Sequence, residues 1–559
     1  VEAAIEDIRE SNILKDKKIS FRGEVLYNID SRRIIDGEIE RIMLVIIPLI
    51  IIILLIAAKS WFEPVIILLT LGVAILLNSG TNIIFNDVSY ITQSMAMALQ
   101  LAISLDYSLF FIHRYYEEKA AGLPTVDATV KSVKKTFGSI LGSALTTIVG
   151  FVALLFMQYR FGSDLGLVMG KGIIFSFLST MLLMPILIII FAPLLDKTMK
   201  KGNRTINIDK VAKVAYKNKY VTIIIFVVFA GVALLFQNKI DFLYANTEAT
   251  DDTSVVIQEE ESIKEVFGIS KPIVIMVPNG NVQAEGLLLQ DMIANENIIS
   301  VNSIVTYESF LGIPRQFLPE EITGQFIGEN YTRVIINTNI EKESEEMYDF
   351  SYQLDETISN YYDEYYYLGI GTSTTEIKDI VTDDSLLVTL FSVIGVGLVI
   401  LFIFKSISLP LILLIVIQSA IWMNMSIVFF QGTSIIYIGY LVIQTLQLGA
   451  TIDYAVLLTS RYKEYRVTEN SNKAISNALR NSGISVLISS AVLAIAGYAE
   501  GLLSHISAVK EIGILIGRGA LLSGVLVIFV LPSLLIIFDK LVMKTTYKAN
   551  FYIEENISD

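Results

Sequence analysis

The chain has 559 residues, of which 53% are hydrophobic, and its mean hydropathy is +0.61. A soluble protein of this length does not need so much apolar sequence, and the excess lies in runs of about 18–25 residues, long enough to cross a bilayer. The absence of cysteine excludes disulfides and Cys-ligated metals, and two histidines are too few for a His-rich metal site. The net charge of −14 is concentrated between Ile240 and Asp383, where 27 acidic residues outnumber 6 basic ones, so nucleic-acid binding is not expected.

The first forty residues are charged and polar, and neither an initiator methionine nor a signal sequence begins the chain. Their pattern predicts a helix over Val1–Ser11, a short strand around Ile19–Leu26 and a charged helix leading into the membrane. We interpret residues 1–40 as the C-terminal remnant of a first extracytoplasmic module. The rest of that module and a first membrane span would then precede Val1.

A first membrane bundle is predicted over residues 41–195. Its five apolar spans are Arg41–Ala58, Val65–Leu77, Ser89–Ile112, Gly138–Met157 and Gly172–Leu195. Residues 196–219 form a linker with eight Lys or Arg against two Asp, which is typical of a cytoplasmic segment. Residues 220–237 are the next span, the first of a second half.

Hydrophobicity then falls over residues 238–384, and the pattern becomes β-α-β-β-α-β. The expected elements are strands at Pro272–Val277, Ile298–Val305, Tyr331–Thr338 and Tyr365–Gly371, with helices at Val282–Asn295 and Ser344–Tyr362. This order is the signature of a split βαβ, ferredoxin-like α+β module. Five more spans follow over residues 385–539, and residues 540–559 form a short polar tail. The sequence thus predicts a polytopic α-helical membrane protein with 11 spans present.

The two membrane blocks repeat one another. A sixteen-residue piece beginning at Gln100 recurs at Gln447, and from Leu99 to Phe191 the register holds at an offset of 347 without a gap. The matched residues include Asp106/Asp453, Tyr107/Tyr454, Arg114/Arg461, Glu117/Glu464, Ser143/Ser490, Gly150/Gly497, Gly166/Gly513 and Pro185/Pro532. Such a register indicates an internal duplication into two pseudo-symmetric halves.

The distribution of Lys and Arg predicts the topology. If the basic connections 114–135, 196–219 and 461–480 are cytoplasmic, both soluble modules lie on the outer side and the C-terminus lies inside. We therefore expect a multi-pass protein of a bacterial plasma membrane.

The candidate functional residues are Asp106 with Tyr107 and Asp453 with Tyr454. A carboxylate inside a membrane span costs about 2.5–3.5 kcal/mol or more unless it is paired, hydrated or protonated. Equivalent helices of a twofold repeat tend to meet at the pseudo-symmetry axis, so we expect both pairs to lie together near the bilayer midplane. Two carboxylates there cannot both ionise cheaply, which suits a proton relay. The alternative is a protonated aspartate that serves only as interhelical glue.

Other polar residues of the spans are weaker candidates. Ser143, Thr146, Thr147, Ser489 and Ser490 could complete a polar path to the aspartates, or could simply be small residues that allow close helix packing.

Five further residues are interpreted mainly as structural. Gln100 and Gln447 are interpreted as residues that form hydrogen bonds between helices. His113 is interpreted as an interfacial residue, and the alternative is that it forms a proton exit. Arg114 and Arg461 are expected to anchor helix ends at the headgroups.

No motif for a hydrolytic or phosphoryl-transfer enzyme is present. The sequence contains no GxxxxGK[ST], HExxH or GxSxG, so neither ATP hydrolysis nor acyl transfer is indicated and we predict a protein that is not an enzyme. No metal or cofactor is expected.

The duplicated six-span plan and the paired Asp-Tyr motifs resemble the resistance-nodulation-division (RND) superfamily. The segments SLDYSLFFIHRYYEE and TIDYAVLLTSRYKEYR are similar to the motif of its MMPL (mycobacterial membrane protein large) family. That family commonly has a glycine-containing approach to the aspartate, where this chain has Ser104-Leu105 and Thr451-Ile452.

The resemblance implies export, driven by the proton-motive force, of lipids or other hydrophobic or amphiphilic molecules through the outer modules, which RND proteins use as porters. It implies that Asp106, Tyr107, Asp453 and Tyr454 are the proton-relay residues. The expected partners are a lipid or hydrophobic small molecule and membrane lipids, and a monomer or a homo-oligomer fits. Two alternatives are a SecDF-like protein-translocation motor and a sterol-sensing-like scaffold that binds lipid without pumping.

Overall fold

The computed structural model describes residues 2–10, 19–85, 88–200, 213, 216–244, 254–268, 270–340 and 343–552. The chain divides into two compact units. One, here called the module unit, comprises Val1–Arg33, Leu243–Asn246 and Thr250–Thr382, and the other, the membrane unit, comprises Ile34–Phe242, Thr247–Ala249 and Asp383–Asp559. The expected linker 196–219 and tail 540–559 fall partly outside the described residues, at 201–212, 214–215 and 553–559.

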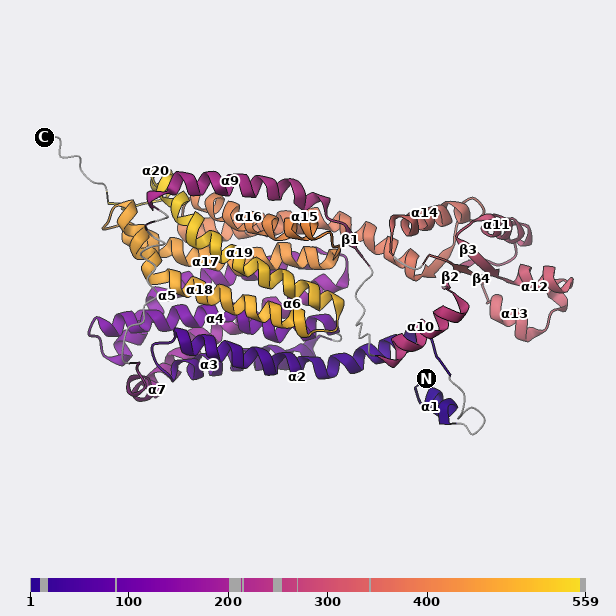
Figure 1. Ribbon diagram of the computed structural model, residues 1–559, viewed down its shortest axis with the longest axis horizontal. Helices are drawn as coiled ribbons and strands as arrows, with labels where there is room; N and C mark the ends of the chain where they lie inside the picture. The colour runs from indigo at the N-terminus through magenta and orange to yellow at the C-terminus, as the bar shows by residue number, and fades with distance from the viewer. Residues whose placement is uncertain are drawn as a thin grey trace. The chain divides into compact units, whose positions relative to one another are not determined.

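The membrane unit is a bundle of long helices that run side by side (Figure 1). Among the described residues, 11 helical segments are long and apolar enough to cross a membrane. The first half consists of α2 (Glu24–Ala57), α3 (Glu63–Gly80), α4 (Tyr90–Ala120), α5 (Thr125–Ala153), and α6 (Arg160–Leu178) joined by a π-helical turn (Ser179–Leu183) to α7 (Met184–Lys197). The second half consists of α9 (Lys219–Phe236), α15 (Ile370–Phe404), α16 (Ser408–Gln431), α17 (Tyr437–Arg466), α18 (Ser471–Leu503), α19 (Ser507–Ile537) and the short α20 (Asp539–Thr545).

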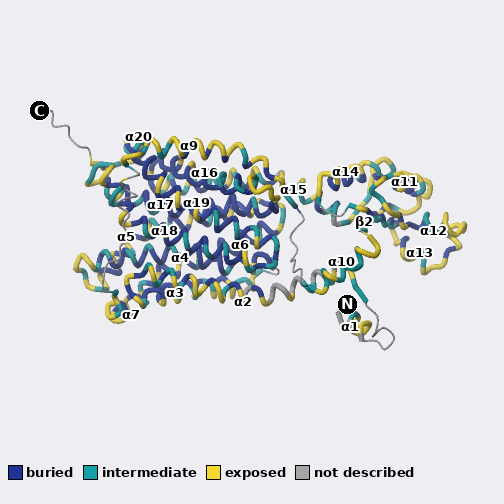
Figure 2. The backbone as a smooth tube through the Cα atoms, viewed as in Figure 1, coloured by how far each residue is buried: buried dark blue, intermediate teal, exposed yellow. Residues whose placement is uncertain are grey.

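Helices α4 and α17 form the centre of the membrane unit. In the most apolar stretch of each helix, 94% of the residues are buried in α17 and 83% in α4, against 22% in α2, α9 and α15 (Figure 2). The outer helices expose their apolar side chains, as helices that face lipid do. The two helices that carry the Asp-Tyr motifs are therefore the ones best shielded from lipid.

The contacts of the glutamines confirm the internal duplication. The Asn78 amide donates to Gln100 Oε1 at 2.8 Å, and Gln100 Nε2 donates to the carbonyl of Gly172 at 3.0 Å. In the second half, the Asn424 amide donates to Gln447 Oε1 at 3.0 Å, and Gln447 Nε2 donates to the carbonyl of Gly519 at 3.3 Å. Both glutamines thus hold helices together, as the sequence predicted.

The module unit contains a four-stranded antiparallel sheet in the order β3-β4-β2-β5. Its strands are β2 (Lys271–Pro278), β3 (Ile298–Asn302), β4 (Tyr331–Thr338) and β5 (Tyr366–Gly369), and its helices are α1 (Glu2–Glu10), α10 (Val255–Phe267), α11 (Val282–Ala294), α12 (Ile304–Leu311), α13 (Glu320–Phe326) and α14 (Glu345–Ser359). Two short strands, β1 (Phe242–Leu243) and β6 (Ile435–Ile436), lie outside this sheet. The chain order β2-α11-β3-β4-α14-β5 with this strand order is the predicted ferredoxin-like arrangement.

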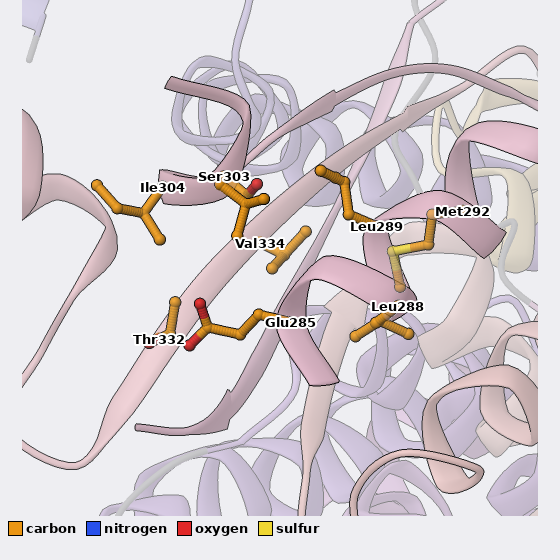
Figure 3. Close-up of a pocket in the computed structure, with 9 residues that line it drawn as sticks. Glu285, Leu288, Leu289, Met292, Ser303, Ile304, Thr332 and Val334 are labelled. Atoms are coloured by element: carbon orange, nitrogen blue, oxygen red, sulfur yellow. The ribbon is translucent and has the colours of Figure 1, made fainter. Parts of the chain in front are cut away.

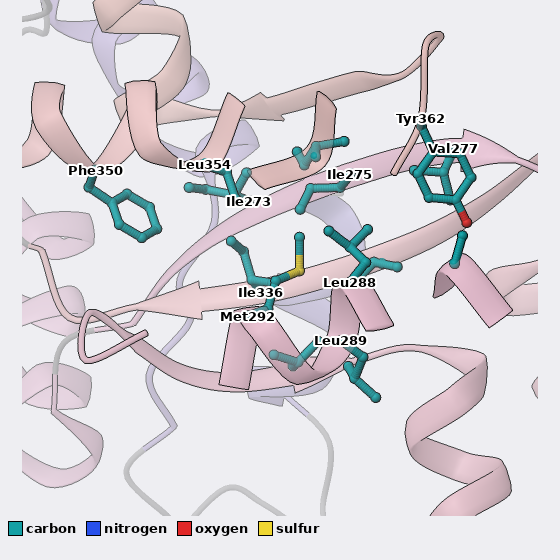
Figure 4. Close-up of a cluster of buried hydrophobic side chains, with 14 residues drawn as sticks. Ile273, Ile275, Val277, Leu288, Leu289, Met292, Ile336, Phe350, Leu354 and Tyr362 are labelled. Atoms are coloured by element: carbon teal, nitrogen blue, oxygen red, sulfur yellow. The ribbon is translucent and has the colours of Figure 1, made fainter. Parts of the chain in front are cut away.

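The core of this sheet follows from alternation along its strands. Ile273, Ile275 and Val277 of β2 are buried on one face, since successive strand residues point to opposite sides. Figure 4 shows them packed with Leu288 and Met292 from the same apolar cluster. Both helices of the split βαβ unit contribute to it.

One expectation about local structure was wrong. The strand around Ile19–Leu26 is absent: α2 already begins at Glu24, and the backbone N–H of Phe21 donates to the Glu259 carboxylate at 2.9 Å instead of to a neighbouring strand. The basic connection 114–135 is mostly helical, because α4 and α5 extend into it and leave only a short turn after Ala120.

A buried carboxylate interrupts the apolar surface of α11. Glu285 lines a small cavity of about 10 Å³ beside Thr332 of β4 (Figure 3). Its side chain is 1% exposed, and the Arg315 guanidinium pairs with it at 2.8 Å and with Glu308 at 2.9 Å. Although burial opposes the charge, hydrogen bonds from Arg315 hold the pKa of Glu308 below its usual value.

Arg315→Met is expected to destabilise the module unit by about 3–5 kcal/mol, because it leaves the Glu285 carboxylate buried without its cation. The measurement is hydrogen–deuterium exchange of the β2 and β4 amides in the whole chain. The double variant Arg315→Met/Glu285→Gln should recover most of the protection, since no charge is then buried alone. Wild-type exchange in the single variant would contradict this role of Arg315.

Candidate functional site

One cavity of about 30 Å³ lies between the central helices and their neighbours α5 and α18. Its lining residues include both Asp-Tyr pairs, and they are Asp106, Tyr107, Phe110, Ser139, Ile140, Ser143, Asp453, Tyr454, Val456, Leu457, Ser485 and Ser489. Residues of the two halves, more than 300 positions apart in sequence, therefore face a common space. The prediction that the two pairs lie together is confirmed.

The tyrosine hydroxyls do not bond to the aspartates. Both Tyr107 OH and Tyr454 OH are buried without a hydrogen-bond partner in the described part of the chain. One carboxylate oxygen, Oδ1 of Asp106, is likewise buried without a partner there, and all three residues line the cavity.

Asp453 is surrounded by hydroxyl groups from α5. The Thr146 and Thr147 hydroxyls lie 3.3 and 3.4 Å from its two carboxylate oxygens, and the Ser143 side chain also acts on it. Only 5% of Asp453 is exposed. The first half thus supplies the polar shell of the second half's aspartate.

These threonines bind backbone carbonyls more closely than they bind Asp453. Thr146 Oγ1 lies 2.6 Å from the Ser143 carbonyl, and Thr147 Oγ1 lies 3.0 Å from the Gly449 carbonyl. Each hydroxyl has one proton to donate and two lone pairs that accept. With that proton given to the backbone, the hydroxyl accepts a hydrogen bond, so this shell suits a protonated, neutral Asp453.

Asp106 has a thinner polar shell. The Ser489 hydroxyl of α18 acts on its carboxylate, but Oδ1 has no partner. The reason lies in the repeat: the positions equivalent to Thr146 and Thr147 are Leu493 and Ala494, which have no hydroxyl. The two aspartates are equivalent in position but not in environment.

The structure adds residues that the sequence did not single out. Ser139 and Ser485 line the cavity, and Ser485 Oγ lies 2.9 Å from His113 Nδ1. Hydroxyls of Ser489 and Ser485 thus lead from Asp106 toward His113 along facing turns of α4 and α18. The sequence held a signal for Ser485: it lies four residues before Ser489, so the two serines share a face of α18.

Ser490, in contrast, does not line the cavity. Its hydroxyl donates to the Leu487 carbonyl at 3.1 Å and packs against Gly524. For Ser490 the packing alternative describes the structure, whereas Ser143, Thr146, Thr147 and Ser489 surround the aspartates.

Arg114 and Arg461 are not headgroup anchors. Their side chains are 8% and 5% exposed, and each pairs with the glutamate of the opposite repeat: Arg114 with Glu464 at 3.3 Å and Arg461 with Glu117 at 2.9 Å. Each also pairs with the glutamate three residues ahead on its own helix. This crossed ion-pair ring fastens α4 to α17 beyond the cavity, because the matched helices place equivalent charges opposite one another.

Comparison with known proteins identifies the family. The MMPL family matches residues 1–210 and 364–550, which is more than half of the chain. The chain belongs to the MMPL family. It is accordingly a membrane protein of the RND superfamily, with the duplicated halves that its sequence predicted.

Curated relatives match this MMPL protein over short segments. The membrane protein MJ1562 of Methanocaldococcus jannaschii is 34% identical over 93 residues, 17% of this chain and 24% of the relative. The apo-petrobactin exporter of Bacillus anthracis is 32% identical over 100 residues, 18% of this chain and 13% of the relative. In both, the matched segment is less than a quarter of the relative's length.

A solved structure shares the fold. SecDF from Thermus thermophilus, described as a translocon-associated membrane protein, superimposes with a TM-score of 0.61 at 13% identity. The match covers 90% of this chain and 62% of SecDF. At this identity the likeness concerns the fold alone.

The crossed ring yields a prediction about stability. In a double-mutant cycle of Arg461→Gln and Glu117→Gln, we expect a coupling energy of about 1 kcal/mol, at the low end for contacting residues because Glu117 is one-third exposed. The mirror cycle of Arg114→Gln and Glu464→Gln should behave alike. The measurement is thermal unfolding of the purified protein in detergent.

The control is a cycle of Arg461→Gln with Lys510→Gln, an exposed residue outside the ring. Its effects should add. Additive effects in the Arg461/Glu117 cycle too would show that the ring does not bind the helices together.

Proposed function

We propose that this MMPL protein is a proton-coupled exporter of lipids or other hydrophobic or amphiphilic molecules, in which Asp106 and Asp453 carry the proton. The observation that supports this most is that two carboxylates, one from each central helix, face a single cavity in an otherwise apolar bundle. A membrane protein bears the cost of an intramembrane carboxylate mostly where it is used.

The polar surroundings of Asp106 and Asp453 differ, which suggests a different role for each aspartate. Asp453 is enclosed by α5 hydroxyls and suits the protonated form, whereas Asp106 has a free oxygen toward the cavity. A cavity of about 30 Å³ is large enough for about one or two waters. A water held there by Asp106 Oδ1 and the tyrosine hydroxyls would connect the two carboxylates. In this proposal Asp106 exchanges the proton with the path through Ser489, Ser485 and His113.

Protonation would act on helix packing. Charging either aspartate requires polar partners or water between α4 and α17, while neutralising it allows these helices to approach. Each central helix contacts a helix of the other half through the shells of the aspartates, so one proton biases the arrangement of both halves. Such a two-state bundle is what coupling a proton gradient to transport requires.

The side of the membrane and the substrate are also proposals. The Lys- and Arg-rich ends favour a cytoplasmic location for the α4–α5 turn and for the C-terminus, with the ferredoxin-like module outside. The name of the Bacillus anthracis relative favours an exporter. The SecDF-like fold favours, as a second candidate, a proton-driven motor that acts on emerging protein.

Asp106→Asn and Asp453→Asn are each expected to reduce proton-gradient-dependent efflux to background, since an amide cannot take up or release a proton. The measurement is efflux of a fluorescent lipid or amphiphile from inside-out or reconstituted vesicles under an imposed pH gradient. Asp164→Asn is the matched control, because Asp164 lies on α6 and does not line the cavity.

Full gradient-dependent efflux by either cavity variant would refute the proton role of that aspartate. If lipid efflux is absent in the wild type but a gradient drives secretion of a translocating protein, the motor is the correct function. Ligand binding with no response to any gradient would favour the scaffold.

Two adjacent serines distinguish a residue of the proposed proton path from a residue that only packs between helices. Ser489→Ala is expected to slow gradient-driven efflux several-fold, because Ser489 is the hydroxyl that acts on Asp106. Ser490→Ala should be close to wild type, because Ser490 does not line the cavity. The readout is the initial efflux rate at equal protein levels. Equal rates in the two variants would remove Ser489 from the path.

A further inference from the structure

Two equivalent carboxylates hold α2 and α15, which are matching helices of the two halves, to the opposite half. Glu38 of α2 accepts hydrogen bonds from the Ser504 hydroxyl and, at 3.1 Å, from the backbone N–H of His505. Asp384 of α15 accepts the backbone N–H of Gln158 at 2.6 Å. In the repeat register Glu38 corresponds to Asp384 and His505 to Gln158. We call each of these two contacts a latch, because it joins α2 or α15 to a turn between two helices of the other half.

The two latches differ in their chemistry. Gln158 uses its side-chain amide to donate a second bond to Asp384 at 3.1 Å, so that carboxylate is satisfied by groups that do not titrate. In the other latch His505 replaces the glutamine, and its Nδ1 lies 3.6 Å from Glu38 Oε2. A second carboxylate, Glu500, stands where the first half has Ala153.

Glu500 is the least satisfied acid of the membrane unit's described residues. It is fully buried, and neither of its carboxylate oxygens has a hydrogen-bond partner. The charged group that acts on it is Glu38, which is itself fully buried. Two ionised carboxylates cannot share such a site without a cation, so the pair must hold a proton.

The surroundings supply no other counter-charge in the described part of the chain. Neither Glu38 nor Glu500 forms an ion pair with a lysine or arginine there. On α19, Gly513 packs against the Glu500 side chain, Lys510 is exposed, and Glu511 accepts the N–H of Ile436 at 2.8 Å. On α2, Arg41 is exposed.

The imidazole is the group that reaches solvent. About one-third (34%) of the His505 side chain is exposed, whereas the Glu38 side chain beside it is 1% exposed. A proton that reaches the buried pair from solvent would pass His505, the exposed member of the cluster. Glu500 lies eleven residues beyond Ser489 on α18, about 16 Å along the helix, so this cluster is separate from the aspartate cavity.

We propose that Glu38, Glu500 and His505 form a second proton-binding site, whose occupancy sets how firmly α2 is held by the turn between α18 and α19. When Glu38 is ionised, its bonds from Ser504 and His505 are charge-assisted and about twice as strong as neutral ones. When the second proton neutralises Glu38, the hold on α2 weakens. The Asp384–Gln158 latch has neither a second carboxylate nor an imidazole, so the proposed site exists in one half only. This inference does not depend on the proposed substrate or on the aspartate relay.

Infrared pH titration of the purified protein tests it without any transport assay. We expect a protonated-carboxyl band near neutral pH that is lost in Glu500→Gln. In Glu38→Gln the midpoint of that band should move to lower pH by about one unit, a tenfold loss of proton affinity, because the neighbouring charge is gone.

Asp384→Asn is the matched control and should leave both the band and its midpoint unchanged. Bands lost in Asp106→Asn and Asp453→Asn should not respond to Glu38→Gln, so this proposal and the aspartate relay can fail separately. The proposal is overturned if Glu500→Gln removes no protonated-carboxyl signal, or if its midpoint is the same with and without Glu38. Either variant alone decides the matter should the other fail to fold.

Discussion

The constraint on which the membrane unit depends is the burial of a carboxylate in each central helix. An acidic side chain facing lipid would be expelled or neutralised, so α4 and α17 must be enclosed by other helices. The burial of these two helices, against the exposure of α2, α9 and α15, is the direct consequence. The residues that line the aspartate cavity come from α4, α5, α17 and α18.

The two halves share the contacts that hold the bundle together and differ in the groups around the aspartates. The Asn–Gln ties and the crossed Arg–Glu ring are the same in both halves, and they hold the bundle together. The groups around the aspartates are not the same: threonines surround Asp453, while Leu493 and Ala494 occupy the equivalent positions near Asp106. Two identical sites in symmetric surroundings would have equal proton affinity. Unequal surroundings allow a proton to prefer one carboxylate, which would give the proposed relay a direction.

The same logic appears at the latches. Asp384 accepts from the backbone and side-chain amides of Gln158, whereas Glu38 accepts from Ser504 and His505 beside a second carboxylate, Glu500. In both places the repeat preserves the contact and changes its chemistry in one half. Helix packing inside a bilayer tolerates such changes only where a buried polar group still finds a partner or a proton.

The sequence by itself determined the membrane class, the 11 spans, the repeat register, the ferredoxin-like order of the module and the positions of Asp106 and Asp453. These follow from local hydrophobicity, from strand alternation and from direct matching of the two halves. It did not show that Thr146 and Thr147 belong to Asp453, that Ser490 lies away from the cavity, or that Arg114 and Arg461 pair across the axis. It also placed a strand near residue 19 where the chain passes directly into α2. Only the tertiary structure decided the contacts of these side chains, because each depends on which helix faces meet: Thr146 and Asp453 are 307 positions apart, and no local pattern encodes their contact.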